Sequence, residues 1–329
     1  MRSPSYAHWD WIRQLTIFRD FERSIGILFL DILPSLTASK AHHFRHSLSI
    51  AFKSYYDRNL DQNASGIVQG RYADLRAGGL DSSDAKNWEV GIMVAGSMNS
   101  IPAAFWLICS IFADENLLDE VRAEVAGLAT TNDIGRKEVR LDVSNLEKQC
   151  PLLWSSWQET LRLRDAAISS RVVDEDTLLN DTYLLKKGSV VQIPTGELHT
   201  SEAIWGPTVN TFDARRFLKS NMEKVPREQK KLQKQGFNPW GGGAVLCPGR
   251  HFATTEILGI TATIVLGYEL KMADNSTLKV PDAKKQVMSV AVLQPADGLD
   301  VMIKRRKEFE DVFWTYDVVG SGGNTASEL

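Results

Sequence analysis

The stretch that decides the fold is Trp240–Arg250, with the sequence WGGGAVLCPGR. Its three consecutive glycines carry no Cβ, so the backbone can bend sharply and approach another group closely. Cys247 stands just before Pro248 and an apolar run that begins at Phe252, so we expect its sulfur at the N-terminus of a helix. Unpaired N–H groups and the positive end of the helix dipole favour a thiolate there. A thiolate in this setting suits a soft metal ion as its ligand.

The same residues also bear on three other interpretations of this loop: a phosphate-binding loop, a zinc site and a helix cap. A phosphate-binding loop would need Gly-Lys-Ser or Gly-Lys-Thr at the helix start, which this sequence lacks. A zinc site would need more ligands than Cys247 and His251 supply, because Cys109 and Cys150 have no partners at a suitable spacing. A glycine loop that caps a helix and buries a cysteine explains the same letters. The loop alone therefore leaves two interpretations open, a metal ligand and a helix cap.

Two segments upstream of the loop carry charged residues in a regular pattern. Pro151 opens a predicted helix, where proline is favoured because the N–H groups of the first turn lack partners. On this helix Glu159 and Arg162, in the stretch ETLR, share one face at i,i+3 spacing and can pair. The second segment is Phe212–Phe217, FDARRF. A pair such as Glu159 and Arg162 also occurs on many solvated helices, so by itself it indicates little.

In their order and spacing these segments resemble the cytochrome P450 superfamily of heme-thiolate monooxygenases. Its Glu-x-x-Arg helix, its Phe-x-Pro-x-Arg-Phe segment and its cysteine loop match Glu159–Arg162, Phe212–Phe217 and Trp240–Ala253, and the match covers most of residues 15–310. The resemblance implies a mainly α fold with small β-sheets, a cytochrome P450-like fold lacking its N-terminal part. We expect one catalytic domain over residues 1–317, incomplete on its N-terminal side, and a flexible tail over 318–329.

The resemblance also implies roles for individual residues. Cys247 would be the axial thiolate ligand of the iron of heme b, and the backbone N–H groups of its loop would tune the sulfur. Arg171 matches a position that commonly contacts a heme propionate, although a solvent-facing turn arginine is an equal alternative. The other implied cofactor-binding residues are Trp240, Gly241, Gly243 and Gly249, and a buried structural network would consist of Glu159, Arg162 and Arg216.

The uncharged stretch Val90–Ala113 predicts a long helix. Within it, Ala95–Ser100 aligns with the family's Ala-Gly-x-acid-Thr segment, which delivers protons to iron-bound oxygen. Met98 and Asn99 replace the acid and the threonine, and methionine cannot ionise. Asn99 and Ser100 are therefore the candidate catalytic residues, with water as the alternative proton source.

The following stretch Asn99–Trp106, NSIPAAFW, looks like the sterol 7-alpha-hydroxylase and prostacyclin synthase branch of the family. The first type hydroxylates a steroid, and the second rearranges a peroxide without a reductase. The main hypothesis is a monooxygenase that inserts one oxygen atom into an apolar small molecule, either terpenoid or steroid-like or a secondary metabolite. The alternatives are a reductase-independent heme-thiolate isomerase and a catalytically dead truncated remnant.

Composition limits the partners. The 38 basic and 41 acidic side chains give a net charge of −3, and nucleic-acid binders need clustered excess Lys and Arg, so no nucleic-acid partner is expected. Three widely spaced cysteines indicate reduced thiols in a cytosol-facing protein. The resemblance implies NADPH-cytochrome reductase as electron donor. Basic residues before the loop fit either its docking or a solvated loop, namely Lys224, Arg227, Lys230, Lys231 and Lys234.

Membrane signals in the sequence are weak. Val90–Ala113 is long enough to span a bilayer, but the polar residues and the proline in its middle favour a buried core helix. We therefore expect no spanning helix, with membrane contact limited to residues 1–36. The resemblance implies association with the endoplasmic reticulum if a preceding anchor exists, and a cytoplasmic location otherwise.

Two hairpins are predicted from strand and turn letters. The first joins Tyr183–Leu185 to Ser189–Ile193 through Lys187-Gly188. The second joins Ser289–Leu293 to Leu299–Ile303 through a turn at Pro295–Gly298.

Overall fold

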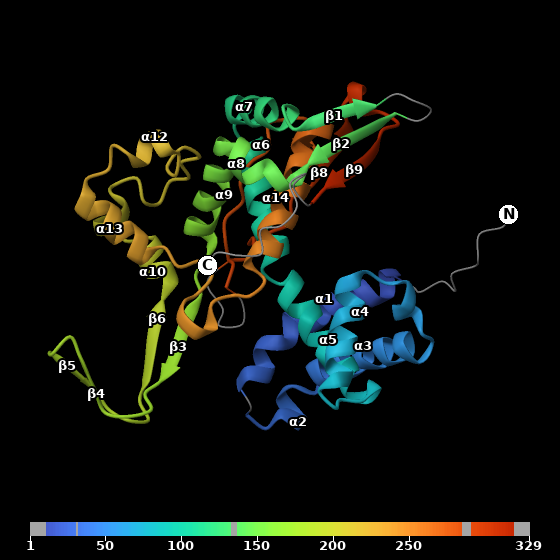
Figure 1. Cartoon of the computed structure of the whole chain (residues 1–329), viewed down its shortest axis with the longest axis vertical. Coiled ribbons are helices and arrows are strands. Elements are labelled where there is room, and N and C mark those ends of the chain that lie inside the picture. Colours follow the sequence, from blue (N-terminus) through green and yellow to red (C-terminus); the bar gives the residue numbers. More distant parts are fainter. Residues whose placement is uncertain (1–10, 31, 133–136, 285–290, 319–329) are drawn as a thin grey trace. The chain divides into compact units, whose positions relative to one another are not determined.

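The computed structural model describes residues 11–30, 32–132, 137–284 and 291–318, and in it the chain forms two compact units that divide between Met98 and Asn99 (Figure 1). The N-terminal unit is helical, whereas the C-terminal unit carries every described strand. This mainly α fold with small sheets is the one predicted from the sequence. The expectation of a single domain over residues 1–317 stays a prediction, and the tail beyond residue 318 lies outside the described residues.

The N-terminal unit is organised around one long helix, α3 (Ser39–Asp57), on which α1 (Trp11–Leu30) and α5 (Ser82–Ser97) both pack. Its small core consists of Phe18, Phe21, Leu48 and Val90. The remaining elements are α2 (Pro34–Thr37), a 3₁₀ turn (Leu60–Asn63) and α4 (Gly66–Ala77).

A buried carboxylate ties the helices of this unit together. Glu89 of α5 accepts a 2.7 Å hydrogen bond from the Tyr56 hydroxyl of α3 and a 2.6 Å hydrogen bond from the Arg71 guanidinium of α4. Burial, and after it the hydrogen bond to Glu89, raises the pKa of Tyr56 well above its usual range. The charge on Glu89 is thus compensated within the unit.

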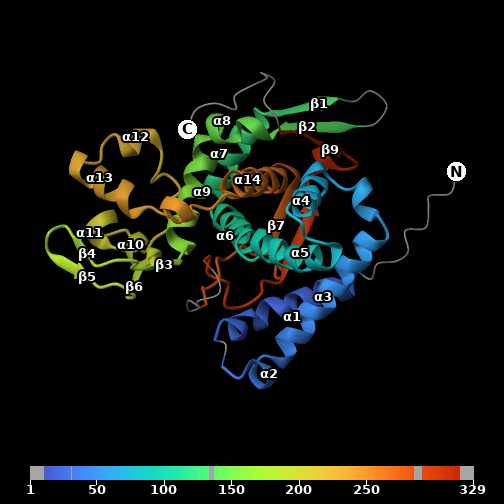
Figure 2. The ribbon, with the colours of Figure 1, turned by 60° about the horizontal axis from the view of Figure 1, so that its bottom comes forward.

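The C-terminal unit is built on four helices that pack around one apolar core (Figure 2). They are α6 (Ser100–Phe112), α7 (Glu115–Ala126), α9 (Pro151–Arg164) and α14 (Arg250–Gly267). Trp106, Leu153, Trp157 and Val265 are fully buried in this core. The shorter helices are α8 (Leu146–Gln149), α10 (Thr195–His199), α11 (Glu202–Trp205), α12 (Lys219–Met222) and α13 (Arg227–Gly236), with 3₁₀ turns at Val143–Asn145, Gly243–Val245 and Lys307–Phe309.

The strands form one three-stranded sheet and three separate pairs. In the sheet, β2 (Glu138–Asp142) pairs antiparallel with β1 (Ala129–Asn132) and parallel with β9 (Phe313–Asp317). The antiparallel pairs are β3 (Ile168–Val172) with β6 (Val190–Pro194), β4 (Thr177–Leu179) with β5 (Tyr183–Leu185), and β7 (Tyr268–Met272) with β8 (Val301–Arg305).

Both predicted hairpins are wrong in their pairing. The tight turn lies at Asn180-Asp181, whose φ angles of 51° and 52° suit a left-handed turn, so β5 pairs backward with β4 and not forward. Ser189–Ile193 pairs instead with β3, as part of β6. Leu299–Ile303 overlaps β8, which pairs with β7, while residues 289 and 290 of the second hairpin lie outside the described residues.

The predicted long apolar helix is interrupted at Met98-Asn99. Pro102 has no N–H to donate to the Met98 carbonyl, and a proline is tolerated in the first turn of a new helix. Among the described residues, Asp84–Phe112 is the one helical stretch long and apolar enough to cross a membrane by length and composition. Its second half, α6, buries Trp106, Leu107 and Ile111 in the core of the C-terminal unit.

An acidic side chain is buried where α9 ends. Asp165 is 2% exposed, and burial raises the pKa of its carboxyl from 3.8 to about 8. The folded state therefore holds a proton between about pH 4 and pH 8 that the unfolded state has released. Stability contributed by this group is present below pH 4 and is lost as the pH rises through this window.

We predict that Asp165→Asn stabilises the protein at pH 8 and has little effect at pH 4. The difference in unfolding free energy should grow by about 1.4 kcal/mol per pH unit inside the window. Thermal melting of the variant and the wild type across this range measures it. Asp174→Asn, at an exposed position on the same segment, is the control and should show no such trend. A wild type that is more stable than Asp165→Asn at pH 8 would contradict the prediction.

Candidate functional site

The cysteine loop joins α13 to α14 and depends on its glycines. Gly241 and Gly243 have φ angles of +72° and +62°, in the left-handed region that side chains with a Cβ rarely adopt. The loop closes on itself, because the Cys247 N–H donates a 2.9 Å hydrogen bond to the Trp240 carbonyl. The tilted ring of Trp240 packs on Trp157 of α9, with 6.3 Å between ring centroids. The start and the end of the loop are thereby held together against the core.

Cys247 lies just before α14, which begins at Arg250 with Gly249 as its N-cap. Arg250 donates a 3.1 Å hydrogen bond back to the Cys247 carbonyl. The thiol of Cys247 is partly exposed, whereas Cys109 and Cys150 are buried and burial raises the pKa of each to about 12. Cys247 is therefore the one of the three cysteines that is both accessible and next to the N-terminus of a long helix.

The surroundings of Cys247 fit a large, flat, apolar group that carries anionic substituents. Val245 and Phe252 are each 58% exposed, which leaves apolar side chains on both sides of the cysteine open to contact. Arg171 of β3 reaches the same loop, where its Nη2 donates a 3.2 Å hydrogen bond to the Gly242 carbonyl. A thiolate ligand flanked by apolar side chains and a guanidinium is the donor set that a heme with its propionates requires.

A metal ion held by side chains alone is not supported in the described part of the chain. Its residues contain no group of three or more His, Cys, Asp or Glu side chains able to hold an ion. Cys247 would thus supply a single protein ligand, and the other ligands would have to come from the bound group.

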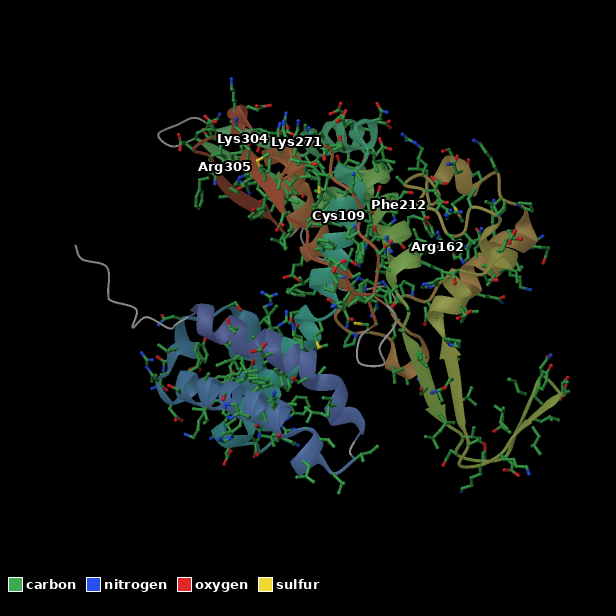
Figure 3. The ribbon with its side chains drawn as sticks, turned by 180° about the vertical axis from the view of Figure 1, so that it is seen from behind. Cys109, Arg162, Phe212, Lys271, Lys304 and Arg305 are labelled. Atoms are coloured by element: carbon green, nitrogen blue, oxygen red, sulfur yellow. The ribbon has the colours of Figure 1, made fainter. Side chains whose placement is uncertain are left out.

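The helix on which the loop packs, α9, carries a buried ion pair. Glu159 and Arg162 are both fully buried and form a bidentate pair, with Nε to Oε2 at 2.7 Å and Nη2 to Oε1 at 2.8 Å. Figure 3 shows Arg162 on α9, with Phe212 on the segment beside it. The two planar groups use their full donor and acceptor geometry, which gives the strongest type of charge-assisted hydrogen bond.

The segment after α11 supplies the third charge. Arg216 Nε lies 3.1 and 3.0 Å from the two Glu159 oxygens, and the Asp213 N–H donates to Oε1 at 3.1 Å. The remaining N–H groups of Arg216 donate to the carbonyls of Trp205, Thr208 and Thr211. The structure thus brings Glu159, Arg162 and Arg216 together: the two guanidiniums share one carboxylate, and backbone carbonyls accept further hydrogen bonds from both.

His199, at the end of α10, connects this ion cluster to the loop. Arg162 Nη1 donates a 2.7 Å hydrogen bond to the His199 carbonyl, and the Asn238 N–H donates to His199 Nε2 at 3.1 Å. Burial, assisted by the charge of Arg162, lowers the pKa of His199 to about 4, so its imidazole stays neutral and its Nε2 can accept. Asn238 lies two residues before Trp240, where the loop begins.

Sequence reasoning missed His199. In the sequence it is a single histidine between a strand and a turn, and a histidine in that setting does not indicate a particular role. Its role depends on α10 packing against α9 and α13, which no local pattern encodes. Tertiary packing also brings the aromatic rings around His199 together. The Phe237 ring lies tilted or edge-on to the rings of His199, Trp205 and Phe217, with centroids 5.3, 6.0 and 5.1 Å away.

Asn99 and Ser100 lie at the start of α6 and belong neither to the cysteine loop nor to the ion cluster around Glu159. Asn99 Oδ1 accepts hydrogen bonds from the backbone N–H groups of Ala291 and Val292, at 3.0 and 3.2 Å. This side chain fixes the returning C-terminal segment to α6. The same contact occupies the oxygen that proton transfer would use.

The basic residues before the loop lie mainly on α13, which ends at Gly236. Lys230 Nζ donates a 3.1 Å hydrogen bond to the Glu223 carbonyl, and Arg227, Lys231 and Lys234 are exposed. A basic helix therefore leads directly into the cysteine loop.

Comparisons with known proteins agree with this geometry. The family model described as Cytochrome P450 matches residues 40–300. The cytochrome P450 monooxygenase nodJ of Hypoxylon pulicicidum is 32% identical over 304 residues, which are 92% of this chain and 59% of that protein. A cytochrome P450 monooxygenase of Gibberella zeae is 31% identical over 307 residues, covering 90% and 58%. The cholesterol 7-alpha-monooxygenase of Cricetulus griseus is 26% identical over 305 residues, covering 89% and 59%. The chain thus spans just under six-tenths of the length of these relatives.

We predict that Glu159→Gln costs about 3–5 kcal/mol of unfolding free energy, because Arg162 and Arg216 would remain buried without a counter-charge. Glu120→Gln is the matched control. Glu120 pairs with Arg215 at 2.7 Å on the surface, where removal of the charge costs less than about 1 kcal/mol. Urea denaturation of the two variants measures the contrast, and equal losses would show that the buried cluster carries no special weight.

Proposed function

The chain belongs to the cytochrome P450 family, and from that premise we propose that residues 1–317 act as one catalytic domain, a heme-thiolate monooxygenase that inserts one oxygen atom into an apolar small molecule. The observation that carries the proposal is the accessible thiol of Cys247, on a glycine loop braced by the buried cluster around Glu159. Family membership implies heme b as the cofactor, and the donor set around Cys247 fits it.

Three kinds of contact would hold the heme. The Cys247 sulfur would be the ligand of its iron, and Trp240, Gly241, Gly243 and Gly249 of the loop would contact it. Arg171, already beside the loop through its bond to the Gly242 carbonyl, would pair with a propionate. The chemistry that a thiolate-bound heme supplies is the activation of molecular oxygen, since the thiolate donates electron density that favours O–O cleavage.

The residues of the chain hold the sulfur in one place. Cys247 lies just before the N-terminus of α14, and the bond from the Cys247 N–H to the Trp240 carbonyl limits the movement of the loop. Val245 and Phe252 present apolar surface that would exclude water from the sulfur once it is covered. The ion cluster and His199 hold the start of the loop against α9.

The nature of the substrate and of the electron donor is also part of the proposal. Similarity to a cholesterol 7-alpha-monooxygenase supports a steroid-like or terpenoid substrate. We propose that electrons come from NADPH through NADPH-cytochrome reductase, with the basic face of α13 next to the loop as a surface of the right charge. A cytosol-facing site at the endoplasmic reticulum would suit such a partner.

A second candidate is a reductase-independent isomerase of the same fold, and the environment of Asn99 favours it. Met98 cannot ionise, and the Asn99 oxygen is occupied by two backbone N–H groups, so proton delivery would fall to Ser100 or to water. An isomerase predicts turnover of a peroxide without NADPH consumption, whereas the monooxygenase predicts NADPH consumption coupled to product.

We predict that the purified chain binds hemin and that its reduced form, exposed to carbon monoxide, shows the difference band of a thiolate-ligated iron. Cys247→Ser should abolish the band, because a serine hydroxyl is not a thiolate. Cys109→Ala, which alters a buried thiol of the same unit, should retain it. A colourless wild-type protein after hemin reconstitution would favour the inactive-remnant hypothesis. An unchanged band in Cys247→Ser would refute the ligand assignment.

A further inference from the structure

The N-terminal unit contains a polar cavity that the proposed chemistry does not use. It has a volume of about 580 Å³ and lies between α3 and α5. Its lining consists of His42, Arg45, His46 and Ser49 of α3 and Asn87 of α5. The four α3 residues follow the spacing i, i+3, i+4, i+7, which places them on one face of the helix.

The hydrogen bonds among these residues fix which of their atoms remain available. Ser49 Oγ donates a 3.0 Å hydrogen bond to Asn87 Oδ1, so the amide oxygen is occupied and the Asn87 NH₂ group keeps its two donors. Arg45 Nη2 lies 3.1 Å from His42 Nδ1. Because a guanidinium can only donate, His42 Nδ1 is the acceptor, and the proton of a neutral His42 ring is on Nε2.

The cavity therefore presents mainly hydrogen-bond donors. It offers the remaining N–H groups of Arg45, the Nε2–H of His42, the amide of Asn87 and the imidazole of His46, and no carboxylate lines it. The acidic residue of α3, Asp57, is paired with Lys53 at 2.5 Å, and Glu89 of α5 is engaged by Tyr56 and Arg71. A site of this kind binds a ligand rich in acceptors and negative charge.

We infer that this cavity binds a phosphate group, either as inorganic phosphate or as the phosphate of an ester. The donors come from two helices and include the planar fork of Arg45, which matches the several oxygens of a tetrahedral oxyanion better than a single carbonyl. The volume exceeds that of a phosphate ion and leaves space for the group that carries the phosphate. A soluble phosphate ester and a phospholipid headgroup share this chemistry.

Isothermal titration of the full chain with inorganic phosphate and with glycerol 3-phosphate tests the inference. We expect one saturable site per chain. Asn87→Asp keeps the acceptor for Ser49 and places a carboxylate among the donors, so the affinity should fall at least tenfold, which is about 1.4 kcal/mol. Arg45→Gln should cause a similar loss. Both side chains are exposed enough for the variants to fold, which circular dichroism checks.

Two matched controls lie on the same helix or at its end, outside the cavity. His43→Gln removes an exposed imidazole next to the site residues, and Arg58→Gln removes an exposed guanidinium after α3, so neither should change the affinity. Equal losses in Arg45→Gln and Arg58→Gln would show a general charge effect and overturn the inference.

A vesicle-binding experiment distinguishes a soluble phosphate or phosphate ester from a phospholipid headgroup as the ligand. Phosphatidylcholine vesicles with and without phosphatidic acid are co-sedimented with the chain and with Asn87→Asp. Binding of the soluble anions identifies a free phosphate or ester as the ligand. Binding confined to phosphatidic acid vesicles, and lost in Asn87→Asp, identifies a lipid headgroup, and both results support the site. Absence of saturable binding in both arms would refute it.

Discussion

The structure of the C-terminal unit depends on a single buried carboxylate, Glu159. Its two oxygens accept hydrogen bonds from Arg162, from Arg216 and from the Asp213 N–H, all at 3.1 Å or less. A buried charge is costly to desolvate, and it is tolerated only where its partners are in place. The carboxylate therefore joins α9 to the turn after α11, and Arg162 extends the connection to the backbone of His199.

The cysteine loop depends on this arrangement through His199. The neutral imidazole of His199 accepts a hydrogen bond from the Asn238 N–H, and the backbone carbonyl of His199 accepts one from Arg162. Trp240 continues the contact by packing on Trp157, which lies two residues before Glu159 on α9. The glycines then turn the chain, and Cys247 lies just before the N-terminus of α14 with a partly exposed side chain. A rigid base for a ligand-bearing loop is what catalysis with a bound cofactor requires, because small displacements of a ligand are costly.

Local patterns predicted the parts of this site that local physics determines. Glycines at positive φ, a cysteine before a helix and the i,i+3 pair Glu159–Arg162 all follow from the chain alone. The partners of Asn99, Asp165 and His199 lie 30 or more residues away or depend on burial, so no sequence spacing announces them. The prediction of strand pairing was wrong for a related reason. The turn was predicted at Lys187-Gly188, whereas β5 pairs with β4 across Asn180-Asp181 and Ser189–Ile193 pairs with the distant strand β3, which local turn residues do not reveal.

Amide hydrogen exchange tests the central claim most directly, namely that the buried charge on α9 fixes the cysteine loop. The comparison is between Glu159→Gln and Val121→Ala, a core variant on α7 that weakens the unit without touching the cluster. The account predicts that exchange over residues 208–217 and 238–247 accelerates much more in Glu159→Gln, at matched overall stability. Equal acceleration in both variants would contradict it, since the loop would then respond only to global stability.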